Sequence, residues 1–165
     1  MNILETERLI VREFTPDDLD GLYTLYENAG PYVAPLSHDR EEERLKLESY
    51  IQYVYGSYGF GLWAVCLKEN GQLIGRCGIQ LESVDGIAEL EMGYLIDRNY
   101  RRKGYGRECV SAVMDFVRQL QCYDHILLRV HRDNIPSMEF AKSLGFVDMG
   151  PLKQAQDFIK FIYEI

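Results

Sequence analysis

The sequence predicts one domain with a mixed α/β fold, in which helices cover both faces of a central sheet. Three observations lead to this prediction. The chain of 165 residues is long enough for one well-buried core and too short for two ordinary domains. Segments of strand composition alternate with segments of helical periodicity. Neither an internal repeat, a low-complexity tract nor a linker interrupts the alternation.

The first third of the chain predicts one strand and two helices. ERLIVREF, residues 7–14, mixes apolar and charged residues as an edge strand does. Residues 15–18 supply an N-cap threonine, a proline and two acids, so a helix is expected at about 16–28. The glycine and prolines of residues 29–36 end it. A second helix is expected from about Asp39, where the acidic start DREEER complements the helix dipole.

The rest of the chain predicts more strands and two more helices. Asn70-Gly71 lies between two apolar segments and predicts a hairpin with a tight primed turn. Helical spacing follows Tyr105, and another helix over 135–146 is closed by Gly145. The expected strands are 60–68, 72–81, 87–96, 125–130 and a C-terminal pair that ends in DFIKFIYEI.

Composition excludes several classes of function. A net charge of -8 opposes binding to nucleic acid and favours cationic partners. No segment is apolar over a membrane-spanning length, and the start MNILETERLIVREF is too charged for a signal peptide, so a cytoplasmic protein without membrane contact is expected. The cysteines form neither a C-x-x-C pair nor a zinc-site spacing with histidine, and we interpret them as reduced core residues: Cys66, Cys77, Cys109 and Cys122. No metal is expected.

The segment after the strand at 87–96 has the features of an anion site. That strand is predicted to end at Ile96, and a helix begins near Tyr105, so free backbone N–H groups lie at a positive helix end. Glycines at 104 and 106 allow close approach of a ligand to the backbone. A dinucleotide fingerprint would need glycine at Cys109, and no Gly-Lys-Ser/Thr is present for a P-loop. The alternative is a glycine-rich turn with a solvated basic surface. The cations are Arg101, Arg102, Lys103 and Arg107.

Residues 101–106, Arg-Arg-Lys-Gly-Tyr-Gly, resemble the Arg/Gln-x-x-Gly-x-Gly/Ala pyrophosphate loop of the GNAT superfamily of acyl-CoA-dependent N-acyltransferases. Further similarity is to the ribosomal-protein alanine N-acetyltransferase branch, in three segments that cover much of the chain: TERLIVREFTPDD, AELEMGYLIDRNYRRKGYG and RDNIPSMEFAKSLGF. The resemblance implies one N-acetyltransferase domain over residues 1–165, with a mostly antiparallel, twisted sheet that splays at the cofactor site.

The resemblance also implies acetyl-CoA or coenzyme A as acyl-donor substrate, without a metal, and a set of residues around it. Leu95 and Ile96 would pair with the pantetheine amides where the strand splays from its neighbour. Asn134 matches the cofactor-side asparagine, although it is also a natural helix N-cap. The diphosphate would lie over Arg101, Arg102, Lys103, Gly104, Tyr105, Gly106 and Arg107.

Glu91 is the leading general base, because it matches the glutamate of the family's Glu-x-Gly-Tyr strand. Glu89 lies on the same strand face, and two like charges there can raise one carboxyl pKa. The alternative is that both acids are simply solvated. Many GNAT enzymes carry a tyrosine that protonates the leaving thiolate where this chain has Ala141. Ser137 or water would replace it, and Ser137 could also touch the cofactor.

The acceptor is less well defined by the sequence. Resemblance places the loop between the first two helices at the acceptor pocket, so Tyr32 is a candidate to line it, and Trp63 is a further candidate. Both are also ordinary packing residues. The acidic chain favours a cationic amine such as a protein N-terminus, a polyamine or an aminoglycoside. The expected function is N-acetyl transfer by direct attack in a ternary complex, by a monomer or homodimer. The alternatives are a non-catalytic acyl-CoA-binding sensor or interaction module, and an unrelated phosphate-binding α/β domain.

Overall fold

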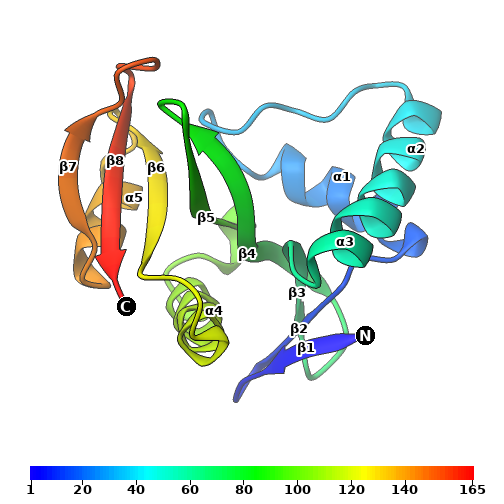
Figure 1. Ribbon diagram of the computed structural model, residues 1–165. Coiled ribbons are helices and arrows are strands. Elements are labelled where there is room, and N and C mark those ends of the chain that lie inside the picture. Colours follow the sequence, from blue (N-terminus) through cyan, green and yellow to red (C-terminus); the bar gives the residue numbers. More distant parts are fainter. The chain divides into compact units, whose positions relative to one another are not determined.

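A computed structural model describes all of residues 1–165 and contains an eight-stranded sheet with strand order β1-β2-β3-β4-β5-β6-β8-β7 (Figure 1). The strands are β1 Asn2–Glu5, β2 Leu9–Arg12, β3 Leu62–Leu67, β4 Leu73–Val84, β5 Ile87–Ile96, β6 His125–His131, β7 Val147–Pro151 and β8 Phe158–Glu164. The helices are α1 Leu19–Glu27, α2 Arg40–Tyr50, α3 Gly56–Tyr58, α4 Tyr105–Leu120 and α5 Ile135–Ser143. β5 and β6 run parallel, and the other strand pairs with an assigned register are antiparallel. The predicted mixed fold with a mostly antiparallel sheet is confirmed.

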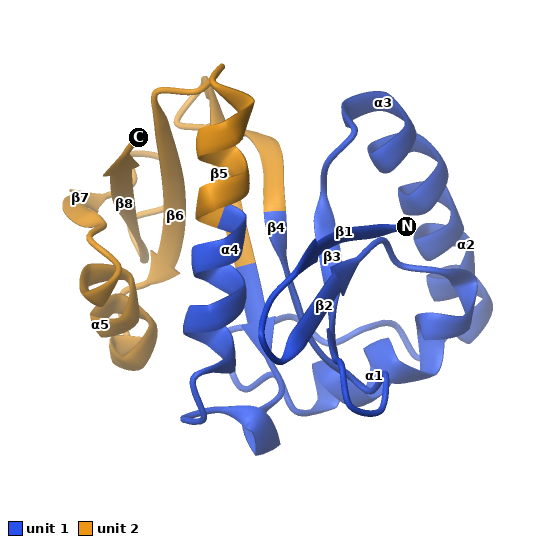
Figure 2. Ribbon diagram, turned by 90° about the horizontal axis from the view of Figure 1, so that it is seen from below, with its two compact units in different colours: residues 1–78, 94–113 blue, residues 79–93, 114–165 orange.

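The chain divides into two compact units (Figure 2). Unit 1 comprises Met1–Gly78 and Tyr94–Val113, and unit 2 comprises Ile79–Gly93 and Met114–Ile165. β4, β5 and α4 each contribute residues to both units. Each unit is described separately below.

In unit 1, helices pack on both faces of the strands, as predicted. Successive side chains of a strand point to opposite faces. Arg76 of β4 donates a hydrogen bond to Tyr26 of α1, whereas the next residue, Cys77, hydrogen-bonds with Cys109 of α4. The interior between these layers is apolar, and its fully buried side chains include Leu9, Val11, Leu25, Trp63, Val65 and Ile74.

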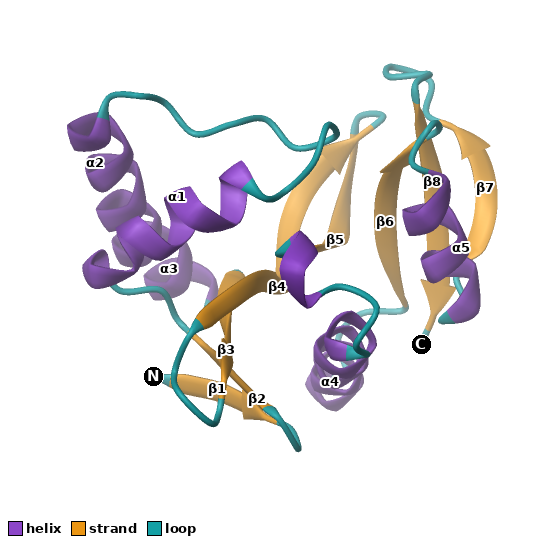
Figure 3. Cartoon of the chain, turned by 180° about the vertical axis from the view of Figure 1, so that it is seen from behind, coloured by secondary structure: helices purple, strands orange, loops and turns teal.

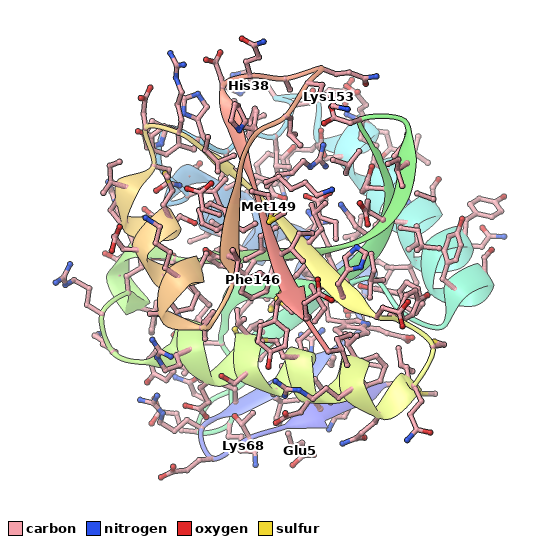
Figure 4. All side chains as sticks on the ribbon, turned by 60° about the vertical axis from the view of Figure 1, so that its left-hand side comes forward. Glu5, His38, Lys68, Phe146, Met149 and Lys153 are labelled. Atoms are coloured by element: carbon pink, nitrogen blue, oxygen red, sulfur yellow. The ribbon has the colours of Figure 1, made fainter.

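Two sequence predictions for unit 1 are wrong in detail. The strand within residues 7–14 is not at the edge, because β1 pairs with it on one side and β3 on the other. At the edge, Lys68 and Glu5 form an exposed ion pair of 3.4 Å (Figure 4). The β3–β4 hairpin has no two-residue turn: its loop covers residues 68–72, in which Gly71 has φ +73° and donates to the carbonyl of Leu67. Glycine takes this left-handed conformation without strain.

The helix starts of unit 1 follow the predicted capping chemistry. The expected first helix begins with a 3-10 turn at Pro16–Asp18, and the carboxylate of Asp18 accepts from the backbone N–H of Thr15 at 2.8 Å. The Asp39 carboxylate accepts from the N–H groups of Glu41 and Glu42 at the start of α2, which satisfies donors that lack a helical partner.

Unit 2 is built on the strands β6, β8 and β7, with α5 beside them (Figure 3). α5 ends where Gly145 takes φ +94°, as the sequence predicts. Phe146 is buried and its ring lies 5.5 Å from that of Tyr163, whereas Met149 of the edge strand β7 is exposed (Figure 4). A small buried cluster comprises Val84, Leu127, Leu152 and Ile162.

The pairing of β5 with β6 is short in unit 2. Their parallel register contains one pair, Glu91 with Leu127, whereas β6 and β8 pair along the whole of His125–His131. Met92 and Gly93, the last residues of β5 in this unit, have no registered partner on β6. A strand that leaves its neighbour frees backbone N–H and C=O groups for another partner.

Three cysteines are buried, as predicted, and Cys122 is exposed, contrary to the prediction. The hydrogen bond with Cys109, together with burial, raises the pKa of the Cys77 thiol. Cys77 therefore stays protonated at neutral pH and unreactive. None of the helices is long and apolar enough to cross a membrane.

Candidate functional site

The loop that follows β5 is anchored by a buried aspartate in unit 1. The Asp97 side chain is buried and accepts from the backbone N–H of Asn99 at 2.8 Å and from the Asn28 side-chain amide at 3.1 Å. Its own N–H donates to the carbonyl of Ile74 on β4. These bonds fix the point at which the chain leaves Ile96 and turns toward α4.

The turn into α4 contains a left-handed glycine with open space beside it. Gly104 has φ +86°, and its carbonyl accepts from the N–H of Glu108 in the first turn of the helix. A Cβ at Gly104 would meet nothing within 4 Å apart from the end of the Arg8 side chain, at 3.1 Å. The first N–H groups of a helix have no partner within it. The start of α4 therefore combines such groups with a glycine turn that has room beside it.

The cationic residues of the loop differ in their hydrogen-bond partners. Arg101 donates to the carbonyls of Ile96 and Ala29, both at 2.8 Å, and so ties the loop to the segment after α1. Lys103 donates to the Asn99 carbonyl at 3.1 Å. Arg102 is exposed and has φ +60°. Of the four predicted phosphate contacts, Arg101 therefore has a structural role that the sequence did not predict.

Arg8 is a further cation at this loop that sequence reasoning missed. Its guanidinium pairs with Glu108 at 2.7 Å, donates to the Lys103 carbonyl at 2.9 Å, and lies 4.3 Å from the ring centre of Tyr105. Nothing in the sequence around residue 8 indicates this contact, because the partners are about a hundred positions away.

Arg101→Met is expected to destabilise the fold by about 1–3 kcal/mol, because two backbone carbonyls lose a charged donor. The midpoint of urea unfolding measures the change. Arg102→Met is the matched control, since it removes the same charge from the neighbouring exposed residue and should leave the midpoint unchanged. Equal stabilities of the two variants would contradict the anchoring role.

Unit 2 holds the two predicted carboxylates, and their surroundings differ. The Glu89 carboxylate is buried and accepts from His125 Nε2 at 2.6 Å and from Lys160 Nζ at 3.0 Å. Burial acts to raise its pKa, but the hydrogen bonds from these two residues outweigh burial, and the pKa of Glu89 lies below its ordinary value. Glu89 is therefore a firmly ionised group.

The pKa of Glu91 is shifted in the opposite direction from that of Glu89. Its side chain is buried, and burial raises its pKa above the ordinary value in spite of two hydrogen bonds from Arg129, at 3.0 and 2.5 Å. The sequence analysis attributed a raised carboxyl pKa to repulsion between Glu91 and Glu89. In the structure the pKa of Glu91 is raised by burial and, to a small extent, by the charge of Glu82. The sequence did not reveal Arg129 as the partner of Glu91, because β6 lies beside β5 only in the fold.

Asn134 and Ser137 lie together at the start of α5 in unit 2. The side-chain oxygen of Asn134 accepts from the backbone N–H of Ser137 at 3.3 Å, so Asn134 is the N-cap of α5. Ala141, where many GNAT enzymes have tyrosine, is fully buried in the helix. A phenol would not fit there without repacking, which accounts physically for the small residue.

Of the two acceptor-side candidates, only Tyr32 is accessible. Tyr32 is 43% exposed on the segment that follows α1, and Gly30 of that segment approaches the Arg101 side chain. Trp63 is fully buried in the core of unit 1. No group of three or more His, Cys, Asp or Glu residues is placed to hold a metal ion.

Comparison with known proteins gives the family. The model of the acetyltransferase (GNAT) domain matches residues 8–147. The uncharacterized N-acetyltransferase YjdG of Bacillus subtilis (strain 168) is 28% identical over 56% of this chain. The match spans about half of that relative, 54% of its length. The uncharacterized N-acetyltransferase p20 of Bacillus licheniformis is 27% identical over 93% of this chain and 86% of its own. The solved ribosomal-protein-S5-alanine acetyltransferase of Vibrio fischeri has the same fold, with a TM-score of 0.76 and 19% identity over 98% of this chain and 95% of its own. The chain belongs to the GNAT family of acetyltransferases.

Proposed function

We propose that the chain, as a single N-acetyltransferase domain, moves an acetyl group from acetyl-CoA to a primary amine by direct attack in a ternary complex. The observation that carries the proposal is the course of β5. This strand bears the buried carboxylate Glu91, whose pKa is raised, and ends at Ile96. A 3-10 turn at Arg98–Tyr100 and the glycine turn at the start of α4 come next in the chain. The proposed base and the proposed anion-binding turn therefore lie a few residues apart in the sequence.

The residues present fit acetyl-CoA. The glycine turn leaves room that a Cβ at residue 104 would occupy, and the N–H groups of α4 suit the diphosphate. Arg102, Lys103 and Arg107 would add charge, with Tyr105 and Gly106 in the same turn. Leu95 and Ile96 would pair with the pantetheine amides, and Asn134 and Ser137 would meet the cofactor from α5. Arg8 joins this set because it lies against Lys103 and Tyr105.

The reaction needs a neutral amine and one proton acceptor. The amine nitrogen attacks the thioester carbonyl, the C–S bond breaks, and the electron pair leaves with the sulfur of CoA. Glu91 accepts the proton that the nitrogen loses, directly or through a water molecule. Arg129 remains beside the carboxylate and balances its charge before the transfer. Ser137 or water protonates the thiolate, and a strong acid is not needed for this leaving group.

The acceptor that we propose is a protein N-terminus or a small cationic amine. The net charge of -8 attracts cations. Tyr32 would contact the acceptor, and Trp63 would support the pocket only through packing. The name of the Vibrio fischeri protein, which refers to ribosomal-protein alanine, is in keeping with a protein N-terminus.

A non-catalytic acyl-CoA sensor is the second candidate function. Two observations favour it: the Glu91 carboxylate is held by both arms of the Arg129 guanidinium, and Ala141 provides no acid for the thiolate. A base that remains ion-paired is a weaker proton acceptor. Turnover distinguishes the two functions, because a sensor binds acetyl-CoA without releasing thiol.

The experiment is a two-substrate assay of released CoA thiol, with acetyl-CoA and a panel of N-terminal peptides, polyamines and aminoglycosides. We expect thiol release that depends on one class of amine, and double-reciprocal lines that intersect, as direct transfer in a ternary complex requires. Parallel lines would instead indicate a covalent acyl-enzyme and would contradict direct attack.

A further inference from the structure

Unit 1 contains a partly open cavity that none of the roles proposed above uses. Most of its lining residues belong to α1, α2 and β4, elements that Figure 2 shows, and its volume is about 140 Å³. A cavity of this size is far larger than one water molecule needs and is similar to one that holds a benzene ring, about 150 Å³. Its apolar lining comprises Phe14, Leu19, Leu22, Leu36 and Leu47.

The polar residues of the lining are Tyr26, Glu43, Lys46, Tyr50 and Arg76. Glu43 is satisfied, because its carboxylate accepts from the N–H of Ser37 and from Lys46 Nζ, both at 3.0 Å. Lys46 is further neutralised by Glu42 at 2.6 Å. The negative charge and one of the two positive charges at the cavity are thus already paired.

Arg76 is the charged residue of the lining that has no ion-pair partner. Its Nη1 donates to the Tyr26 hydroxyl at 2.5 Å, and its guanidinium lies 5.6 Å from the ring centre of Tyr50. Its Nε is buried and has no hydrogen-bond partner, and no carboxylate pairs with the guanidinium. The other partly buried arginines of unit 1, Arg12 and Arg44, do pair with carboxylates.

A buried N–H donor without a hydrogen-bond partner is costly, because it loses its bonds to water and gains none in the protein. A planar carboxylate is the group that best matches the donor fork of arginine. The hydroxyl of Tyr26 already accepts from Arg76, which leaves its own proton available as another donor. The groups beside the cavity that still lack a partner are therefore hydrogen-bond donors, namely Arg76 Nε–H and the Tyr26 hydroxyl. Donors next to a positive charge favour an anion as the ligand.

We propose that this cavity binds a small organic carboxylate, with the carboxylate on Arg76 and Tyr26 and an apolar body of about six carbons among the leucines. An inorganic anion is a poorer ligand for this cavity, since it would make no contact with the aliphatic and aromatic side chains of the lining. Binding at this cavity does not require acyl transfer and is separate from the proposed acetyl-CoA loop.

The test is a calorimetric titration of the full chain, without acetyl-CoA, with three probes that share one six-carbon apolar body: 5-methylhexanoate, 5-methylhexan-1-ol and 5-methylhexan-1-amine. We expect saturable binding of the carboxylate that is at least tenfold tighter than that of the alcohol, and no binding of the amine. Equal affinities of carboxylate and alcohol, preference for the amine, or no binding by any probe would overturn the proposal.

Variants locate the site. Arg76→Met is expected to weaken carboxylate binding at least tenfold, and Arg76→Lys, which keeps the charge but loses the fork, should weaken it several-fold. Arg132→Met removes a charge from an exposed arginine of unit 2 and should leave the affinity unchanged. Circular dichroism confirms that each variant is folded. Carboxylate binding that Arg76→Met and Arg76→Lys leave unaltered would place the ligand elsewhere and refute the assignment.

Discussion

Gly104→Asp is expected to weaken CoA binding about a hundredfold while the chain stays folded. The new Cβ fills the space at the turn, and its carboxylate faces the position of the proposed diphosphate. Loss of charge-assisted hydrogen bonds and repulsion between like charges together amount to about 3 kcal/mol, which corresponds to that factor. Calorimetric titration with CoA measures it.

Gly71→Asp is the matched control for this prediction. Gly71 has φ +73°, close to the +86° of Gly104, and a Cβ there would have open space around it. Both variants therefore introduce the same charge and a similar backbone strain of about 1–2 kcal/mol into turns of unit 1. We expect CoA affinity to fall only in Gly104→Asp. An unchanged affinity in that variant, or an equal loss in the control, would refute the assignment of the loop.

Glu91→Gln is expected to lower kcat about 100- to 1000-fold, with little change in the dissociation constant for acetyl-CoA. A general base typically contributes a factor of this order, and glutamine cannot accept the proton. The remaining activity should lose the acidic limb of its pH–rate profile, because that limb reports the protonation of Glu91. A variant with an unaltered profile would exclude Glu91 as the base.

Arg129→Gln is the informative partner of Glu91→Gln, since it removes the same ion pair and leaves the carboxylate in place. The hydrogen bonds and charge of Arg129 lower the pKa of Glu91, so their loss raises that pKa further. A base is active when deprotonated, and the acidic limb should therefore move to higher pH while activity persists above it. A limb that does not move would mean that it does not report the protonation of Glu91. A loss of activity equal to that of Glu91→Gln would instead indicate that the ion pair itself is needed.

The features that the sequence predicted well are local in the chain. The glycine turn, the start of α4 at Tyr105 and the end of α5 at Gly145 follow from residues within a few positions of each other. Capping groups and left-handed glycines act over such short ranges. For this reason the position of the glycine turn could be predicted before the fold was known.

The features that the sequence did not predict depend on distant partners. Arg129 meets Glu91 only because β6 runs beside β5, and Arg8 meets Glu108 only because the start of the chain lies against α4. The unpaired state of Arg76 is likewise a property of what packs around it. The hairpin loop at residues 68–72 differs from the predicted tight turn because the strand register, and not Asn70-Gly71 alone, sets the loop length.

The measurement that tests the central claim most directly is the stoichiometry of thiol release with acetyl-CoA and a saturating amine from the responsive class. The proposed transfer predicts one acetylated amine, identified by mass, for each thiol released, and no release above background when the amine is omitted. Tight binding of acetyl-CoA without thiol release on any amine of the panel would contradict the transferase and favour the sensor.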